Sequence, residues 1–312
     1  MQRVEAFNRR SPSSSAGLTR LRKWLGGSYA PYVFVAPFFI LFAIFGLYPL
    51  LYALRLSFTY WHGAGAPRFI GLSNYTYLLT NNFFWQSLTT SAVIWLLVVP
   101  VQTVFAILAA VILSGQTLRF RWFFRTAFLT PYVVPLVAVA QIWLILFDQQ
   151  SGAANTILQA LHLPAVGWLT DAAWARVTLA LLVLWKSSGF AIVVMLAALQ
   201  SIPQEYYEAA AIDGAGAQAQ FWLITVPLLR RAISFFLIIG TLGVIQMFAE
   251  PYVLFNQSGG PENAGTTAGY FLLSYITNAD YGTGAANSFL LMVVVVVVAL
   301  VLLRALRTSE EA

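Results

Sequence analysis

Six apolar segments divide this chain, and each is long enough to cross a lipid bilayer as a helix. About 20 helical residues span the hydrocarbon core of a membrane. The segments are roughly Tyr32–Phe58, Ser87–Leu113, Arg125–Phe147, Ala175–Leu199, Ala232–Leu254 and Ala286–Leu303. Inside lipid every backbone N–H and C=O group needs a partner within the chain, and a helix supplies it. The sequence therefore predicts an all-α membrane protein with six transmembrane helices.

The basic residues fall mostly on one side of these predicted spans. With the N-terminus in the cytoplasm, 13 of the 17 Lys and Arg residues lie in the N-terminal tail, after spans two and four, or after span six. Cytoplasmic loops of membrane proteins carry an excess of Lys and Arg. This asymmetry predicts that both termini and the polar segment after span four are cytoplasmic. It also explains the net charge of +6 without a nucleic-acid partner.

The chain is predicted to hold one membrane domain and one tail. Only 9% of its residues are charged, whereas soluble domains carry about 25%. We therefore assign residues 29–312 to a transmembrane domain. Residues 1–28 are basic and Ser-rich, and we interpret them as a cytoplasmic tail. They are not expected to be a cleavable signal peptide, because the apolar segment that follows is too long.

Residue types that carry metal-binding or nucleophilic chemistry are scarce. The sequence has no cysteine, and its two histidines, His62 and His162, lie far apart with no second ligand beside them. No phosphate-binding run of the form GxxxxGK(S/T) occurs, and neither Lys23 nor Lys186 follows a glycine-rich loop. We therefore expect no catalytic site, no metal site and no ATPase activity in this chain.

The polar stretch EYYEAAAIDGAGAQAQFWLITVP separates the fourth and fifth spans. Ser201 and Gln204 have the spacing of a capping box. Because Gly214 is a stop signal, we expect a helix over Ser201–Asp213 and a second helical piece over Gln218–Val226. The small residues of the first helix favour docking in a groove of a partner protein. An ordinary interfacial loop helix explains the same residues equally well.

This stretch resembles the EAA signature of the membrane subunits of binding-protein-dependent ABC importers. Glu208-Ala209-Ala210 is followed by Gly214 and then by Ile224-Thr225-Val226-Pro227, in which valine stands where leucine is usual. Three further runs resemble the carbohydrate branch of that family, which contains the maltose-F-like and multiple-sugar permeases. They are FIGLSNYTYLL at 69–79, YVLFNQSGGP at 252–261 and YGTGAANSFLL at 281–291.

The resemblance implies a type I ABC importer permease fold with a coupling loop over residues 201–229. The residues implied to couple the permease to an ATPase are Glu208, Ala209, Ala210, Asp213, Gly214, Ile224 and Pro227. In this reading Glu208 is the polar anchor and Gly214 the hinge-like break. The implied function is translocation of a carbohydrate across a bacterial inner membrane by alternating access.

The resemblance also implies several partners. They are a second, related permease subunit that completes a heterodimer, two copies of a cytoplasmic ATPase, an extracytoplasmic solute-binding protein and the membrane lipids. ATP and Mg²⁺ are expected to be used by the ATPase, so no cofactor is expected in this chain.

Polar residues inside a predicted span are costly and mark candidate sites. In the run WKSSGF, Lys186, Ser187 and Phe190 match the family position where the fourth core helix lines the sugar site. In the run LTPYVVP, Tyr132 is placed toward the pathway by the same resemblance. Lys186 is also explained by a structural ion pair or a snorkelling amine, and Tyr132 by ordinary aromatic packing.

Two further pathway candidates lie in the fifth span. Gln246 and Glu250 are four residues apart, so we expect them on one face of one helix. Gln246 lies in IQMFAE, which resembles the family run FQxFD with Ala249 in the usual acidic position. These candidates fit a neutral sugar, while Lys186 also allows an acidic or phosphate-bearing solute.

Two other classes of protein compete with this interpretation. An ion-coupled secondary transporter usually contains internal repeats, and none is evident here. A membrane-embedded enzyme needs a catalytic constellation of side chains, and none is present.

Overall fold

The computed structural model describes residues 30–115 and 120–307. The tail predicted over residues 1–28 lies outside these described residues. The chain divides into two compact units, residues 1–55 and 56–312, and each is described here by itself.

The described part of the first unit is one apolar helical span. It comprises α2 (Ala30–Phe42), a π-helical turn η1 (Ala43–Leu47) and α3 (Tyr48–Ser57), whose last two residues belong to the second unit. None of its apolar window is buried within the chain. A helix that is apolar on all sides needs an apolar environment, and the hydrocarbon of a bilayer provides one.

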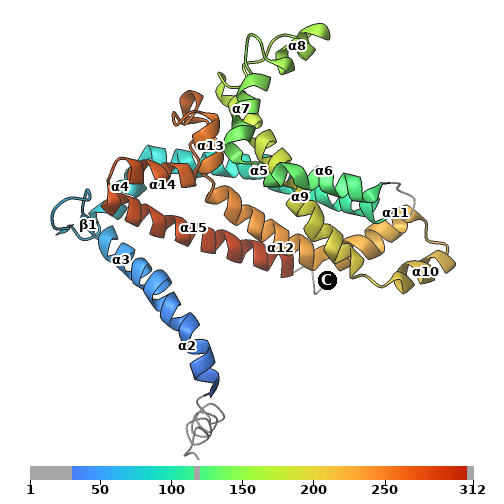
Figure 1. Cartoon of the computed structure of the whole chain (residues 1–312), viewed down its shortest axis with the longest axis horizontal. Coiled ribbons are helices and arrows are strands. Elements are labelled where there is room, and N and C mark those ends of the chain that lie inside the picture. Colours follow the sequence, from blue (N-terminus) through green and yellow to red (C-terminus); the bar gives the residue numbers. More distant parts are fainter. Residues whose placement is uncertain (1–29, 116–119, 308–312) are drawn as a thin grey trace, which may run out of the picture. The chain divides into compact units, whose positions relative to one another are not determined.

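The second unit contains the remaining helices and one short hairpin (Figure 1). Its long helices are α5 (Asn82–Ser114), α6 (Arg121–Val133), α7 (Leu136–Leu146), α9 (Ala172–Gln200), α12 (Val226–Ile245) and α15 (Tyr281–Arg307). Its shorter elements are β1 (Thr59–Tyr60), β2 (Arg68–Phe69), α4 (Ser73–Thr80), α8 (Ala153–Ala160), α10 (Gln204–Ile212), α11 (Ala217–Gln220), η2 (Phe221–Thr225), α13 (Ala249–Leu254), η3 (Pro261–Asn263) and α14 (Ala268–Thr277). Strands β1 and β2 pair antiparallel.

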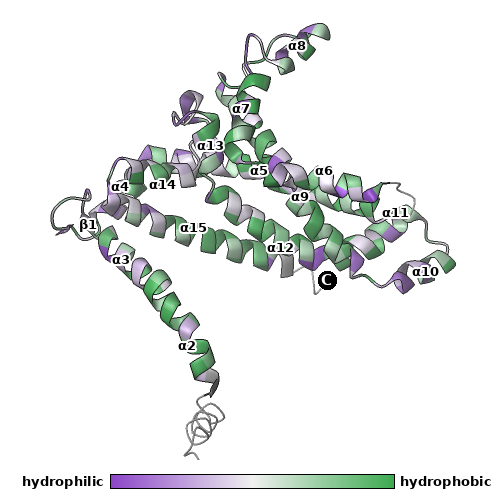
Figure 2. Cartoon of the chain, in the orientation of Figure 1, coloured by the Kyte–Doolittle hydropathy of each residue, from purple (hydrophilic) through white to green (hydrophobic). Residues whose placement is uncertain are grey.

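Within the described residues, five helical stretches are long and apolar enough to cross a membrane, and the bent pair α6–α7 makes six when it counts as one span. The prediction of six transmembrane segments in an all-α protein is confirmed, apart from the unpredicted two-residue strands. Figure 2 shows mostly apolar residues along α9, α12 and α15, and hydrophilic as well as apolar residues in α10.

Side-chain caps fix where two of the long spans begin. The Asn81 side chain accepts a hydrogen bond of 2.9 Å from the Phe83 amide at the start of α5. The Asp171 carboxylate accepts from the Ala173 and Trp174 amides, at 2.9 and 3.1 Å, at the start of α9. The first amides of a helix have no partner inside it, so these caps stabilise both starts.

Helices α5 and α9 pack along each other and form the centre of the second unit, with α12 against both. Toward α7 and α13, the buried cluster contains Ile94, Val98, Leu179, Leu182, Val139, Trp143 and Leu254. Toward the coupling loop, a second cluster contains Ala106, Ala110, Ala191, Met195, Leu229 and Phe236. Small residues in the second cluster let the three helix backbones approach closely, as in other membrane bundles.

The third predicted span is broken into α6 and α7, which meet at an angle of 96°. The residue before a proline disfavours helical geometry, and Val134, before Pro135, is extended with φ −66° and ψ 134°. Pro135 itself has no N–H to continue the helix. The third predicted span is therefore completely interrupted at this proline.

The fifth span ends at Ile245 instead of Leu254, and the prediction that Gln246 and Glu250 share a face of one helix is wrong. Gln246 ends α12, whereas Glu250 lies in α13. Pro251 cannot donate to the carbonyl of Met247, four residues earlier, and that carbonyl accepts from the Thr267 hydroxyl instead. Gly269 packs so close to the Gln246 carbonyl that a Cβ would lie 2.4 Å from its oxygen.

A buried asparagine joins three elements at the end of the bundle opposite the coupling loop. The Asn74 amide of α4 donates to the carbonyls of Ser57 and Thr59, both at 2.9 Å. Its oxygen accepts from the Thr283 hydroxyl of α15 at 3.3 Å. This junction unites two of the runs noted in the sequence, FIGLSNYTYLL and YGTGAANSFLL.

A second buried asparagine organises the loop between α7 and α9. The Asn155 amide donates to the carbonyls of Gln149 and Val166, both at 2.9 Å. Its oxygen accepts from the Val166 amide and from the Trp168 indole, both at 3.0 Å. Asn155 is fully buried, so these four bonds satisfy the whole side chain and order the loop.

We expect Asn155→Ala to make the loop between α7 and α9 open locally. Each buried polar group left without a partner costs about 1–3 kcal/mol. The substitution removes the hydrogen-bond partner of the Val166 amide, of the Val166 carbonyl and of the Trp168 indole N–H. Limited proteolysis of the reconstituted protein should cut this loop in Asn155→Ala and spare it in the exposed control Gln159→Ala. Equal resistance of the two variants would show that Asn155 does not hold the loop.

Candidate functional site

The coupling loop forms an exposed helix, α10, that ends at a left-handed glycine. Gly214 has φ +84°, a conformation that glycine adopts without steric cost. The Gly214 amide donates to Ala211 O at 3.1 Å, and the Ala215 amide donates to Ala210 O at 2.8 Å. These two bonds define a Schellman motif, which satisfies the last carbonyls of the helix. The predicted break at Gly214 is confirmed.

The predicted start of this helix is wrong. Ser201 ends α9, and its hydroxyl donates to Ala198 O at 2.7 Å instead of capping a new helix. Helix α10 begins at Gln204, and Pro203 at its N-cap makes no side-chain cap. Proline fixes its own φ and disfavours helical geometry in the residue before it, which separates the two helices without a capping box.

Hydrogen bonds across the loop hold α10 against the return helix. The Tyr207 hydroxyl and the Thr225 hydroxyl are 3.0 Å apart. The Gln220 side chain donates to Ala215 O at 3.0 Å. The sequence did not reveal these contacts, because partners 18 positions apart follow no helical or strand periodicity.

The residues predicted to couple the permease to an ATPase fall into two groups. Glu208, Ala209, Ala210, Asp213 and Gly214 share α10 and its C-terminal turn, whereas Ile224 and Pro227 lie on the return path through η2 and α12. Pro227 lacks the N–H that would pair with Leu223 O, and the turn before it is π-helical.

The exposed side of α10 is partly apolar. Ile212 is 87% exposed and Tyr206 is 55% exposed, and Glu208 and Ala209 are also exposed. Exposed apolar side chains rimmed by polar ones are typical of a protein-interaction surface. This arrangement favours partner docking over the ordinary loop helix.

A pocket of about 210 Å³ lies among α5, α9, α12 and α13. Three of the predicted pathway residues line it, namely Ser187, Phe190 and Glu250. The side chain of Gln102 also lines it and donates to the Ser187 hydroxyl at 2.7 Å. Gln102 is not among the residues predicted from the sequence, although the rule that polar residues inside a span mark candidate sites applies to it as much as to Lys186.

Tyr132 and Lys186 meet beside this pocket. The Tyr132 ring stacks on Phe190 with a centroid distance of 5.8 Å. The Lys186 amine donates to the carbonyls of Tyr132 and Val134, at 3.3 and 3.2 Å, and lies 6.0 Å from the Tyr132 ring centre. Among the described residues Lys186 has no ion pair, so the structural ion pair allowed by the sequence does not form within them.

The two candidates of the fifth predicted span lie in different surroundings. Glu250 lines the pocket from α13, whereas Gln246 is exposed and is not among the lining residues. The structure therefore brings together Tyr132, Lys186, Ser187, Phe190 and Glu250, and it leaves out Gln246.

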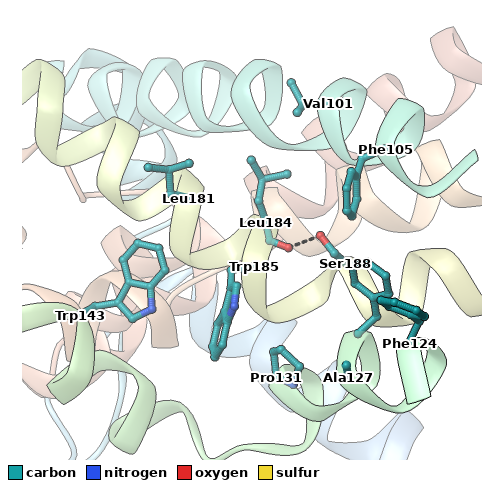
Figure 3. Close-up of a pocket in the computed structure, with 11 residues that line it drawn as sticks. Val101, Phe105, Phe124, Ala127, Pro131, Trp143, Leu181, Leu184, Trp185 and Ser188 are labelled. Atoms are coloured by element: carbon teal, nitrogen blue, oxygen red, sulfur yellow. Dashed lines mark hydrogen bonds between the residues drawn. The ribbon is translucent and has the colours of Figure 1, made fainter. Parts of the chain in front are cut away.

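A larger pocket of about 580 Å³ opens on another face of α9, between α5, α6 and α7 (Figure 3). Its lining is aromatic and aliphatic apart from Ser188, whose hydroxyl donates to the Leu184 carbonyl of its own helix. It offers few hydrogen-bonding groups, so the smaller pocket is the better candidate for a polar solute.

Solved structures share this architecture. The chain superimposes on a crystal structure of a bacterial ABC transporter involved in the import of the acidic polysaccharide alginate, with a TM-score of 0.77, 22% identity and coverage of 93% of this chain and 99% of that one. A second structure of a bacterial alginate transporter, in complex with alginate pentasaccharide-bound periplasmic protein, gives a TM-score of 0.75 at 23% identity, covering 91% of this chain and 96% of that one. At these identities the likeness establishes the fold.

Sequence relatives are closer. The lactose transport system permease protein of Rhizobium radiobacter is 33% identical over 84% of this chain and 89% of its own length. The sulfoquinovosyl glycerol permease of Agrobacterium fabrum is 32% identical over 94% and 96%, and the arabinooligosaccharides permease of Bacillus subtilis is 34% identical over 88% of each. Residues 102–308 match the family described as the binding-protein-dependent transport system inner membrane component. The chain therefore belongs to this family of inner-membrane ABC transporter permeases.

Proposed function

We propose that this chain is the transmembrane permease subunit of an ATP-driven importer that moves a carbohydrate across a bacterial inner membrane. The observation that carries the proposal is the exposed helix α10, which ends in the Schellman motif at Gly214 and is held in place by Tyr207 and Thr225. The exposed side chains of Ile212 and Tyr206 of that helix would bind in a groove of an ATPase subunit.

The proposed solute is a sugar because several relatives are named for sugar transport. The candidate pathway fits such a solute. Phe190 and Tyr132 supply aromatic faces, and Gln102, Ser187 and Glu250 supply hydrogen-bonding groups around the smaller pocket. Sites for polar ligands combine an apolar lining with a few placed polar groups in this way.

The proposed partners are a second permease subunit, two copies of a cytoplasmic ATPase that use ATP and Mg²⁺, and an extracytoplasmic binding protein that delivers the sugar. Closure of the two ATPase subunits would move α10, and α9 would carry that movement into the membrane. A ligand or partner shifts a conformational equilibrium only through such differential contacts.

The proposal differs in its energy source from an ion-coupled secondary transporter, the competing class considered from the sequence. Reconstituted with its co-purifying subunits and binding protein, this chain should take up sugar only when ATP is supplied inside the compartment that faces α10. Uptake should continue after ionophores have collapsed the ion gradients. Uptake that follows an ion gradient and ignores ATP would contradict the proposal.

Gly214→Val should weaken binding of the ATPase. A branched residue in the left-handed conformation costs about 1–2 kcal/mol, so the Schellman turn should distort while the membrane domain is unaffected. The measurement is recovery of ATPase subunits with the purified permease, together with uptake. Gly216→Ala is the matched control, because Gly216 has φ −70° and no atom close to an added Cβ. Full ATPase recovery in both variants would count against the assigned role of Gly214.

Phe190→Ala should slow uptake at saturating binding protein. An aromatic contact contributes about 0.5–1.5 kcal/mol, which corresponds to a rate lower by about 2- to 12-fold if it acts in translocation. Phe190→Tyr keeps the ring and should retain most of the rate. Equal rates in all three proteins would remove Phe190 from the pathway.

A further inference from the structure

The hydrogen bonds of Lys186 lie where helix α6 stops beside α9. Helix α6 ends at Val133, and α7 starts at Leu136. In an unbroken helix the Tyr132 carbonyl would accept from the amide of Leu136, four residues on. The break removes that continuity, and the Lys186 amine donates to the carbonyls of Tyr132 and Val134 instead.

The charge of Lys186 suits this position electrostatically. The C-terminal end of a helix carries a partial negative charge from its unpaired carbonyls. A lysine amine has three N–H donors, so it can serve both carbonyls at once. An ammonium group inside a span is costly unless it finds such partners, and the end of α6 supplies them within this chain.

A tight helix contact brings the amine to the break. At Gly189, one turn beyond Lys186, an added Cβ would lie 2.2 Å from the Phe128 carbonyl oxygen of α6. Only a residue without a side chain allows this approach. The backbones of α6 and α9 are therefore locked together at Gly189, and the Lys186 side chain extends from the same region of α9 to the end of α6.

The same helix connects the break to the coupling loop. Helix α9 runs without interruption from Ala172 to Gln200, and α10 begins at Gln204. A movement of α10 therefore acts on the end of a single rigid helix that carries both Lys186 and Phe190. Phe190 in turn stacks on Tyr132, the residue whose carbonyl accepts a hydrogen bond from Lys186.

We propose that Lys186 is a positioning residue that ties the α6–α7 break to α9, so that movement of the coupling loop reaches the Tyr132–Phe190 pair. Lys186 acts here through the backbone of α6 and not by contact with the solute. The inference rests on the proposed function in one respect, namely that an ATPase moves α10.

The absence of cysteine makes a direct test possible. Phe123→Cys on α6 and Ile145→Cys on α7, which are 55% and 74% exposed, provide two spin-label sites on either side of the break. In nanodiscs with the co-purifying subunits, pulsed electron paramagnetic resonance should give one narrow distance distribution for this pair. Lys186→Met should broaden or shift the distribution in the absence of nucleotide, and Lys186→Arg should restore it, because Arg keeps the charge and the donors.

Uptake supplies the second measurement. Lys186→Met should retain its ATPase subunits and lose ATP-driven uptake, whereas Lys186→Arg should regain uptake. Val193→Met is the matched control, since it places the same new side chain on a 41% exposed position of α9 and should leave both readouts unchanged. If Lys186→Met fails to assemble, Lys186→Gln takes its place in the comparison with Lys186→Arg.

An unchanged distance distribution together with normal uptake in Lys186→Met or Lys186→Gln would overturn the positioning role. So would a broadened distribution that Lys186→Arg does not restore. Failure of the proposed function looks different, because the unsubstituted chain would then lack ATP-driven uptake whatever the nucleotide-free distances are.

Discussion

A bilayer offers the backbone no hydrogen bonds, and this constraint governs every irregular segment of the membrane domain. Among the described residues, spans are broken at Val134-Pro135 and around Met247, and at each break a side chain from another part of the chain donates to carbonyls that the broken helix leaves without their usual partner. The Lys186 amine does so at the first break and the Thr267 hydroxyl at the second. Both breaks lie near the pocket that Gln102, Ser187 and Glu250 line. Irregular backbone thus lies beside a cavity that carries a few polar groups, where a membrane protein tolerates it.

The same constraint explains what could be predicted from the sequence. The spans follow from apolar length alone, and the end of α10 follows from glycine chemistry at Gly214. The break of the third span follows from Pro135. Each of these features depends on residues within a few positions of one another, so a local pattern reveals it.

The features that could not be predicted depend on distant partners. Glu250 leaves the helix of Gln246 because Pro251 and Thr267 act together, and Thr267 lies well beyond the predicted span. The contact of Tyr207 with Thr225 and that of Gln102 with Ser187 join residues 18 and 85 positions apart. The capping box at Ser201 had the right spacing, but the proline at position 203 decided where the helix begins. The family resemblance therefore predicted the coupling loop and the pathway region, while tertiary contacts decide which of their residues meet.

Two of the runs that resemble the family contact each other in the fold. Asn74 and Thr283 come from separate runs, 209 positions apart, and bond to each other in a buried junction. Gly282 allows this approach, since an added Cβ would lie 2.1 Å from the Thr59 carbonyl oxygen. The runs at 69–79 and 281–291 therefore serve the packing of the bundle end opposite the coupling loop, whereas the EAA run presents an exposed surface.

Crosslinking tests most directly whether an ATPase subunit binds α10 on the cytoplasmic face of the membrane. A photoreactive group attached to Ile212→Cys, the only cysteine in the chain, should couple in membranes to a nucleotide-hydrolysing subunit identified by mass spectrometry. The same group on Gln159→Cys, in the loop between α7 and α9, should not reach that subunit. Capture of the ATPase from position 212 alone is the predicted result. Capture of no subunit from position 212, or labelling of that position from the outer face of the membrane, would contradict the account.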